Sequence, residues 1–257
     1  MKKYNLFLSI LLMFAVTGIV SCSKDPHYTP PSSSFTGSLL YNGAPIGVAN
    51  NGQGGSVNGP QSGQNYNSVF FSLIQPGYPK NGAVFVVINQ DGSFSDLLFN
   101  GSYKLSFPTG VYPFVPQNAD TVPVTISGNT KLNINVTPYY MFDNDDFSLS
   151  SSDSIVTAKF GITQVITGVN ALPLSAVYLY ISRTSFVDNN INAAAVSIQG
   201  SAITDMSNIQ LTLKVPSTLN TNGANGAAGQ SNIYVRLGIQ VSNRAQLLYS
   251  DIKELSF

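Results

Sequence analysis

Short runs of alternating hydrophobic and polar residues make up most of the chain after residue 34. In 130–136 (TKLNINV), for example, Leu132, Ile134 and Val136 are separated by polar residues. A period of two residues predicts a strand with one buried face and one wet face. No segment of useful length shows the period of about 3.6 residues that an amphipathic helix would have. The sequence therefore predicts an all-β fold.

The predicted strands fall into two sets. The first comprises 35–41, 68–75, 83–88, 93–98, 102–107, 121–126 and 130–136, and the second 146–150, 155–165, 176–183, 194–199, 209–215, 232–241 and 247–256. Turn pairs such as Asp91-Gly92 separate several of them, because glycine tolerates positive φ. Since the strand pattern restarts after Thr137-Pro138, we predict two tandem antiparallel β-sandwich domains, 34–138 and 139–257.

Three finer expectations follow from the same pattern. The segments 47–67 and 216–232 are so rich in Gly, Asn and Ser that we predict mobile loops unable to bury apolar area. Leu247 and Leu248 are adjacent, which predicts a bulge in the last strand. The inward face of 232–241 is predicted to carry Ile233, Val235, Leu237, Ile239 and Val241.

The first 33 residues follow a different pattern. Two lysines precede an apolar run of 15 residues, Leu6 to Val20, which is shorter than the about 20 residues of a membrane-spanning helix. The run ends in Ile19-Val20-Ser21-Cys22, which resembles a bacterial lipobox, where the signal is cut before the cysteine and the thiol is acylated. Cys22 is also the only cysteine, so it has no partner for a disulfide.

We therefore predict a lipoprotein signal peptide in 1–21, a lipid anchor at Cys22 and a Pro/Ser-rich tether in 22–33. The alternative is a plain secretory signal with an unrelated cysteine nearby. Ser23-Lys24-Asp25 resembles the export signal of Bacteroidetes lipoproteins. The resemblance implies anchoring in the outer membrane, facing the cell exterior.

Composition narrows the range of partners. Charged residues make up only 9% of the chain, against roughly 25% in a typical domain. Without residues 1–21, 12 acidic residues face 10 basic ones, and no basic stripe exists to neutralise phosphates, which argues against nucleic acid. The many amide and hydroxyl side chains suit a neutral polar ligand such as a sugar, and equally suit an inert scaffold.

The residues for hydrolytic chemistry are sparse. A glycosidase needs a pair of carboxyl groups, but the chain has one glutamate, Glu254, and 11 scattered aspartates. His27, the only histidine, lies in the tether, away from any site for nucleophilic catalysis. We predict no catalytic residues and no cofactor.

Asp143-Asn144-Asp145-Asp146 is the densest group of oxygen ligands. It has two interpretations, a Ca²⁺ site or a solvated interdomain turn whose side chains cap their own backbone. Because the segment lacks the glycine and the distal glutamate of an EF-hand loop, we favour the turn and predict no metal site.

Tyr66, Tyr78 and Tyr112 lie in or beside predicted loops of the first domain. An exposed tyrosine can stack on a sugar, whereas a tyrosine can also pack with its ring buried. These three are the candidate carbohydrate contacts. Tyr139 to Phe142 are expected to pack at the joint between the domains.

Several turn and core motifs carry a family resemblance. The first set of strands resembles a carboxypeptidase-regulatory or transthyretin-like domain. The resemblance rests on four segments: Phe35-Thr36-Gly37-Ser38-Leu39, Asn42-Gly43-Ala44-Pro45-Ile46, Asp91-Gly92-Ser93-Phe94 and Asn100-Gly101-Ser102-Tyr103-Lys104-Leu105. The second set of strands resembles a fibronectin III or immunoglobulin-like domain. The chain as a whole resembles a two-domain Bacteroidetes surface-lipoprotein family of largely unassigned function. This resemblance includes Val136-Thr137-Pro138-Tyr139 at the joint and Tyr234-Val235-Arg236-Leu237-Gly238 near the end.

This family is similar to accessory proteins of starch-utilisation-type glycan uptake loci. The resemblance implies a non-catalytic outer-membrane lipoprotein that binds poly- or oligosaccharide weakly, or binds the glycan importer complex. The alternative is a structural or adhesive surface module whose partner is a protein of the importer or of a host surface.

Overall fold

The structure is a computed structural model that describes residues 29–50, 68–77, 82–117, 121–219 and 231–257. The chain divides into two units, Met1–Pro31 and Ser32–Phe257, and the second unit carries the fold. The predicted signal peptide and Cys22 lie outside the described residues. Within the described ranges, no helix is both long enough and apolar enough to cross a membrane.

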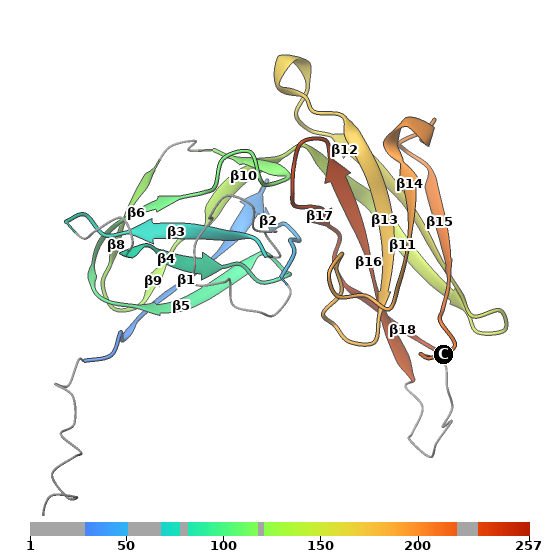
Figure 1. The fold of residues 1–257 in the computed structure, drawn as a ribbon, viewed down its shortest axis with the longest axis horizontal. Coiled ribbons are helices and arrows are strands. Elements are labelled where there is room, and N and C mark those ends of the chain that lie inside the picture. The colour runs from blue at the N-terminus through green and yellow to red at the C-terminus, as the bar shows by residue number, and fades with distance from the viewer. Residues whose placement is uncertain (1–28, 51–67, 78–81, 118–120, 220–230) are drawn as a thin grey trace, which may run out of the picture. The chain divides into compact units, whose positions relative to one another are not determined.

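Residues 32–138, the first half of this unit, form two sheets (Figure 1). One sheet has the order β2-β1-β10-β7, with β5 and β9 also paired to β1, and the other has the order β4-β3-β6-β8. Most ladders are antiparallel, whereas β1 runs parallel to β9 and β10. The strands are β1 (Ser33–Tyr41), β2 (Ala44–Pro45), β3 (Phe70–Ile74), β4 (Val84–Val87), β5 (Ser93–Leu98), β6 (Gly101–Ser106), β7 (Phe114–Pro116), β8 (Val122–Ile126), β9 (Thr130–Lys131) and β10 (Ile134–Pro138).

The core of the first half forms between these sheets. Alternate residues of β1 are buried, and Phe35 is fully so. The Phe94 ring lies 5.3 Å from that of Phe35 and 5.0 Å from that of Phe71, centroid to centroid. Gly37 permits close approach on the same strand, because a Cβ there would lie 1.7 Å from the Leu132 carbonyl oxygen.

Residues 139–257, the second half, also form two sheets, and their ladders are antiparallel. The orders are β11-β12-β15 and β14-β13-β16-β17, with β18 also paired to β16. The strands are β11 (Tyr140–Ser150), β12 (Ile155–Gln164), β13 (Leu174–Ser182), β14 (Ala194–Gln199), β15 (Ile209–Lys214), β16 (Asn232–Val241), β17 (Leu248–Tyr249) and β18 (Lys253–Ser256), with short 3₁₀ turns η2 (Gly168–Asn170) and η3 (Gly200–Ala202).

The predicted all-β fold class is confirmed. The five residues of β16 predicted to face inward are all buried: Ile233, Val235, Leu237, Ile239 and Val241. The last predicted strand, 247–256, divides into β17 and β18, which pair with different parts of β16. The bulge expected at Leu247-Leu248 is misplaced: β17 begins at Leu248 in regular register with β16, and the strand breaks only after Tyr249.

Residues 46–50 of the first half pack against the second half. The Tyr249 backbone N donates to the Gly47 carbonyl oxygen at 3.0 Å, in an isolated antiparallel bridge. Val48 and Ala49 have no exposed surface. The expectation that all of 47–67 buries no apolar area is therefore wrong for 47–50, because β17 covers this segment; 51–67 lie outside the described residues.

A buried arginine, Arg236, connects the halves. It lies on β16, on the face opposite the inward set, yet it is 0% exposed. Its Nε donates to Ser250 O at 2.8 Å, and Nη1 and Nη2 donate to Val48 O at 3.2 Å and Gln90 O at 2.6 Å. Burial lowers the pKa of the guanidinium to about 10, so it remains protonated at neutral pH. One cation thus binds carbonyl groups from both halves.

Asp188 supplies a buried negative charge near Arg236. It is 0% exposed, and its Oδ1 accepts hydrogen bonds from the backbone N of Asn190 and of Ile191. Its Oδ2 accepts a hydrogen bond from Gln90 Nε2 at 3.3 Å. Gln90 therefore contacts both buried charges, through its side chain and its carbonyl oxygen. Such pairing offsets the cost of removing two charges from water.

Candidate functional site

A groove of about 790 Å³ lies where the two halves meet. We call it the junction groove. Its lining comes from the end of β7, the end of β10, the segment around η2, and a turn after β16. The lining residues are Val115, Pro116, Gln117, Thr137, Tyr139, Ile166, Val169, Asn170, Ala171, Leu172 and Arg244.

Strand pairing and one tight turn position the walls of the junction groove. β7 and β10 are antiparallel with Thr137 opposite Val115, so the first half presents these residues together. On the other side, the Ala171 backbone N donates to the Gly168 carbonyl oxygen at 3.1 Å, closing η2. Gly168 has φ +70°, which favours glycine, and Val169 at the tip of this turn is fully exposed. Both walls therefore combine apolar and amide side chains.

Arg244 carries the only charge among the residues that line the junction groove. It is half-buried, and its guanidinium carbon lies 5.1 Å from the centroid of the Tyr139 ring. Nη2 donates to the Tyr139 hydroxyl at 2.7 Å, and Nη1 donates to Asn243 O at 2.9 Å. Its own carbonyl oxygen accepts a hydrogen bond from Gln240 Nε2 at 2.5 Å. These contacts fix the cation at the groove wall.

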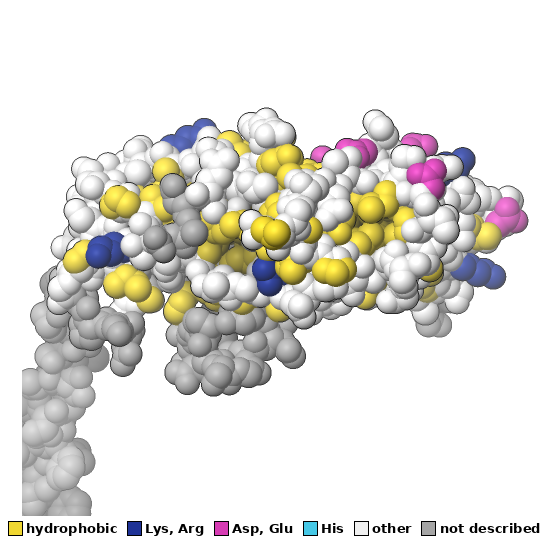
Figure 2. All heavy atoms as spheres, turned by 90° about the horizontal axis from the view of Figure 1, so that it is seen from above, with side chains coloured by type: hydrophobic (Ala, Val, Ile, Leu, Met, Phe, Trp, Pro, Cys, Tyr) yellow, Lys and Arg dark blue, Asp and Glu magenta, His cyan; other side chains and the backbone are white. Residues whose placement is uncertain are grey.

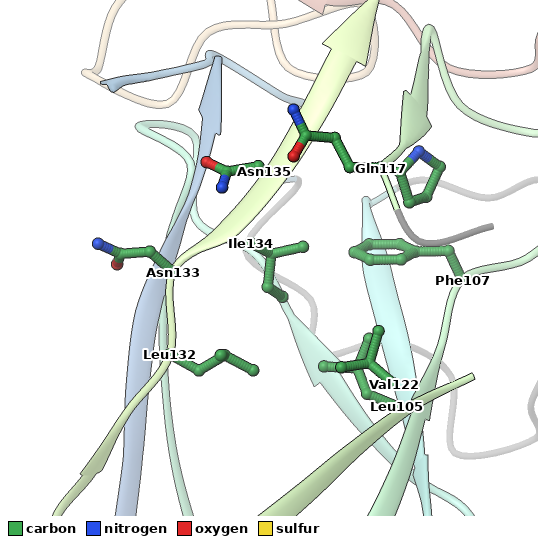
Figure 3. Close-up of a pocket in the computed structure, with 9 residues that line it drawn as sticks. Leu105, Phe107, Gln117, Val122, Leu132, Asn133, Ile134 and Asn135 are labelled. Atoms are coloured by element: carbon green, nitrogen blue, oxygen red, sulfur yellow. The ribbon is translucent and has the colours of Figure 1, made fainter. Parts of the chain in front are cut away.

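A smaller apolar slot of about 110 Å³ adjoins the junction groove, and Pro116 and Gln117 line both. Figure 3 shows Phe107, Leu132 and Ile134 pointing into the slot from different strands and loops. The amides of Asn133 and Asn135 turn away from it (Figure 3). The slot thus offers apolar contact beside the more polar junction groove.

The junction groove has the chemistry of a binding site for a polar ligand. Gln117, Asn170 and Thr137 can exchange hydrogen bonds with hydroxyl groups, while the aliphatic side chains between them can contact apolar faces. Figure 2 shows one face of the molecule, where charged side chains are sparse and hydrophobic ones gather in patches. Among the described residues, no group of three or more His, Cys, Asp or Glu side chains could hold a metal ion.

Of the candidate carbohydrate contacts, the structure describes only Tyr112. It is 3% exposed, and its hydroxyl donates to Phe70 O at 2.7 Å. Its ring stacks on Phe114 with the centroids 5.3 Å apart, and Phe107 meets it edge-on. The exposed interpretation of Tyr112 is therefore wrong, because the ring is part of the core. Tyr66 and Tyr78 lie outside the described residues, as does Cys22.

The acidic segment from Asp143 to Asp146 lies within a strand. It forms part of β11, where the register against β12 shifts between Asp143 and Asp146, and Asn144 has φ +49°. The Asp143 carboxylate accepts a hydrogen bond from the Thr163 hydroxyl. The expectation of an interdomain turn is therefore corrected to a β-bulge on an exposed strand.

Tyr139 and Tyr140 are both buried, as expected for the joint. The Tyr140 hydroxyl donates to Leu172 O at 2.9 Å, so it holds the η2 segment in place. Desolvation on burial raises the pKa of the Tyr140 hydroxyl. Sequence reasoning did not single out Arg244. The only signal was an arginine in a Ser-Asn-Arg turn after a strongly apolar strand.

Family models match almost the whole of the folded unit. Residues 33–137 match the N-terminal domain of DUF3823, a protein of unknown function, and residues 140–254 match DUF3823_C, a domain of unknown function. The chain belongs to the DUF3823 family. The predicted membership of a two-domain family of largely unassigned function is thereby confirmed. No curated protein matches the chain.

Solved structures of DUF3823 proteins share this fold. One from Parabacteroides merdae is 26% identical with a TM-score of 0.70, over 89% of this chain and 100% of its own. One from Bacteroides ovatus is 26% identical with a TM-score of 0.68, over 88% and 99%. A Bacteroides uniformis structure described as a "putative carbohydrate binding protein" is 16% identical with a TM-score of 0.63, over 89% and 100%. The last likeness shows the fold alone.

Proposed function

We propose that this DUF3823 protein is a non-catalytic, surface-exposed outer-membrane lipoprotein, accessory to glycan capture and import, that binds saccharide in the junction groove. The observation that carries this proposal is the groove lining, in which amide, hydroxyl and guanidinium groups stand between aliphatic side chains and no carboxylate is present. Sugars present this combination of hydroxyl groups and apolar ring faces. Glycoside hydrolysis needs two carboxyl groups at the site.

Three further considerations support the proposal. The lipobox-like Ile19-Val20-Ser21-Cys22 supports lipid anchoring. The fold is shared with the Bacteroides uniformis protein described as a "putative carbohydrate binding protein". Both halves contribute to the groove, and sites at domain interfaces are common for small ligands. Tyr66 and Tyr78 remain candidate contacts outside the described residues.

The expected affinity is weak, about micromolar to millimolar, because an open groove buries little of a ligand and leaves few contacts to offset the cost of ordering it. A panel of soluble polysaccharides screened by affinity electrophoresis and calorimetry, alongside a reducing-sugar assay, tests the proposal. We expect binding without product release. Gln117→Ala and Asn170→Ala should weaken binding, whereas Asn208→Ala, an exposed amide before β15, should leave it unchanged.

A protein partner is the second candidate, because Leu97 and Phe99 are 57% and 53% exposed beside the entry of β1. Large apolar side chains exposed together favour contact with another protein. Failure to bind any saccharide, together with co-purification of an outer-membrane protein, would replace glycan binding with a structural or adhesive role. Release of reducing sugar would overturn the non-catalytic assignment.

A further inference from the structure

Arg244 has hydrogen-bonding capacity that the fold does not use. A guanidinium has five N–H donors. The contacts described for Arg244 are Nη1 with Asn243 O, Nη1 with Gly110 O at 3.5 Å, and Nη2 with the Tyr139 hydroxyl. Within the described residues, its Nε hydrogen and one Nη2 hydrogen therefore have no acceptor. Those donors belong to a side chain that lines the junction groove.

The charge of Arg244 is also unmatched within the described residues. Among the described residues, each acceptor of its side-chain hydrogen bonds is a neutral oxygen, and none is a carboxylate. The rest of the groove lining is uncharged. A half-buried cation among neutral neighbours attracts an anion more strongly than it would in open water, because the local dielectric constant is lower.

Arg236 provides a comparison, because it is an arginine with a structural role in the same fold. Its guanidinium is fully buried, binds carbonyl groups through Nε, Nη1 and Nη2, and lies near the buried carboxylate of Asp188. Arg244 differs in each respect, since it is partly exposed, partly satisfied and without a counter-charge among the described residues. Arg244 is therefore placed to receive a ligand.

We infer that the saccharide bound in the junction groove carries an anionic oxygen group, a uronic-acid carboxylate or a sulfate ester, that pairs with Arg244. This inference rests on the proposed function. Arginine binds planar carboxylates and sulfate-like groups through paired, charge-assisted hydrogen bonds. Gln117, Asn170 and Thr137, which line the same groove, provide partners for the hydroxyl groups of the same sugar chain. The anion specifies the ligand, and the neutral groups bind the rest of it.

Matched pairs of ligands test the inference by calorimetry. One pair is an oligogalacturonide and its full methyl ester, and the other is dextran sulfate and unsulfated dextran, which is neutral; inorganic sulfate is a separate probe. We expect the acidic member of at least one pair to bind about 10-fold to 100-fold tighter, which is what a hydrogen bond to a charged group provides. The preference should shrink as salt is raised, because ions screen a partly exposed pair.

Variants assign the effect to the side chain. Arg244→Gln should bind acidic and neutral members equally, and Arg244→Lys should keep part of the preference. Arg183→Gln removes the same charge from an exposed position outside the groove and should behave as wild type. Thermal melting confirms that each variant is folded.

The possible results separate this inference from the proposed function. Equal binding of acidic and neutral members by the wild type would overturn the inference and leave glycan binding intact. A preference that survives in Arg244→Gln would overturn the assignment to Arg244. Inorganic sulfate bound as tightly as the acidic saccharides would overturn the sugar part of the claim. Failure of every saccharide to bind would overturn the proposed function, and the inference with it.

Discussion

Arg236 and Arg244 differ in what each cation contacts, and the reason is local. Arg236 is on a central strand whose outer face is covered by residues 46–50, whereas Arg244 is in the turn that follows the same strand. Alternation along β16 correctly predicted the inward residues, and placed Arg236 on the other face. That face is buried because a segment almost 190 residues away in sequence packs on it, at Val48 O. A period-two pattern contains no such long-range information.

Replacing Arg236 tests its role at the interface. Arg236→Met would leave the carbonyl oxygens of Val48, Gln90 and Ser250 without their donor, and Asp188 without a nearby cation. We expect a loss of about 3–5 kcal/mol in the free energy of unfolding, measured by urea denaturation. Lys214→Met, at an exposed position at the end of β15, should change it by less than about 0.5 kcal/mol. Similar losses in both variants would contradict the structural role.

At the scale of elements, strands with long alternating runs were predictable and very short ones were not. The predictions over 93–98, 194–199 and 232–241 match β5, β14 and β16. β2 and β7 were missed, because strands of two and three residues show no period. β11 begins at Tyr140, six residues before the predicted strand, because a bulge interrupts its pattern at the acidic residues. One wall of the junction groove, at β7, thus escaped prediction.

Gly47 allows the closest contact between the 46–50 segment and β17. A Cβ at this position would lie 2.4 Å from Tyr249 O and 2.8 Å from Arg236 Nη2. Gly47→Ala must therefore push the segment away from β17, and should lower the free energy of unfolding by about 1–3 kcal/mol in a denaturant titration. Gly82→Ala is the matched control, since nothing lies within 4 Å of its added Cβ. An unchanged free energy of unfolding for Gly47→Ala would contradict this, because it would show that the 46–50 segment can move away from β17 without destabilising the fold.

At the scale of the whole molecule, the ladders between named strands join strands of the same half. Contacts between the halves include the Gly47–Tyr249 bridge, the buried Arg236, the Gln90–Asp188 hydrogen bond and the turn that carries Arg244. Buried apolar side chains of both halves also belong to the same clusters. We therefore predict that 34–138 and 139–257, expressed separately, each melt cooperatively in calorimetry. Each should melt at a lower temperature than the full unit, because the shared contacts are lost. A half that is unfolded in isolation would contradict two self-sufficient domains.

Anchoring is a property of the whole molecule that depends on Cys22. Metabolic labelling with a fatty-acid probe should mark the wild type and not Cys22→Ala, because acylation needs the thiol. Protease or antibody accessibility on intact cells should then show the labelled protein at the cell exterior. Equal labelling of wild type and variant would rule out the lipid anchor.

The central claim is that saccharide binds in the groove between the two halves. Hydrogen exchange of backbone amides, measured with and without a saturating binding polysaccharide, tests it most directly because it reports every segment at once. We predict slower exchange in the segments 114–117, 166–172 and 243–246, which form or adjoin the groove walls, and unchanged exchange in β14 and β15, which contribute no lining residue. Protection confined to other segments would contradict the claim.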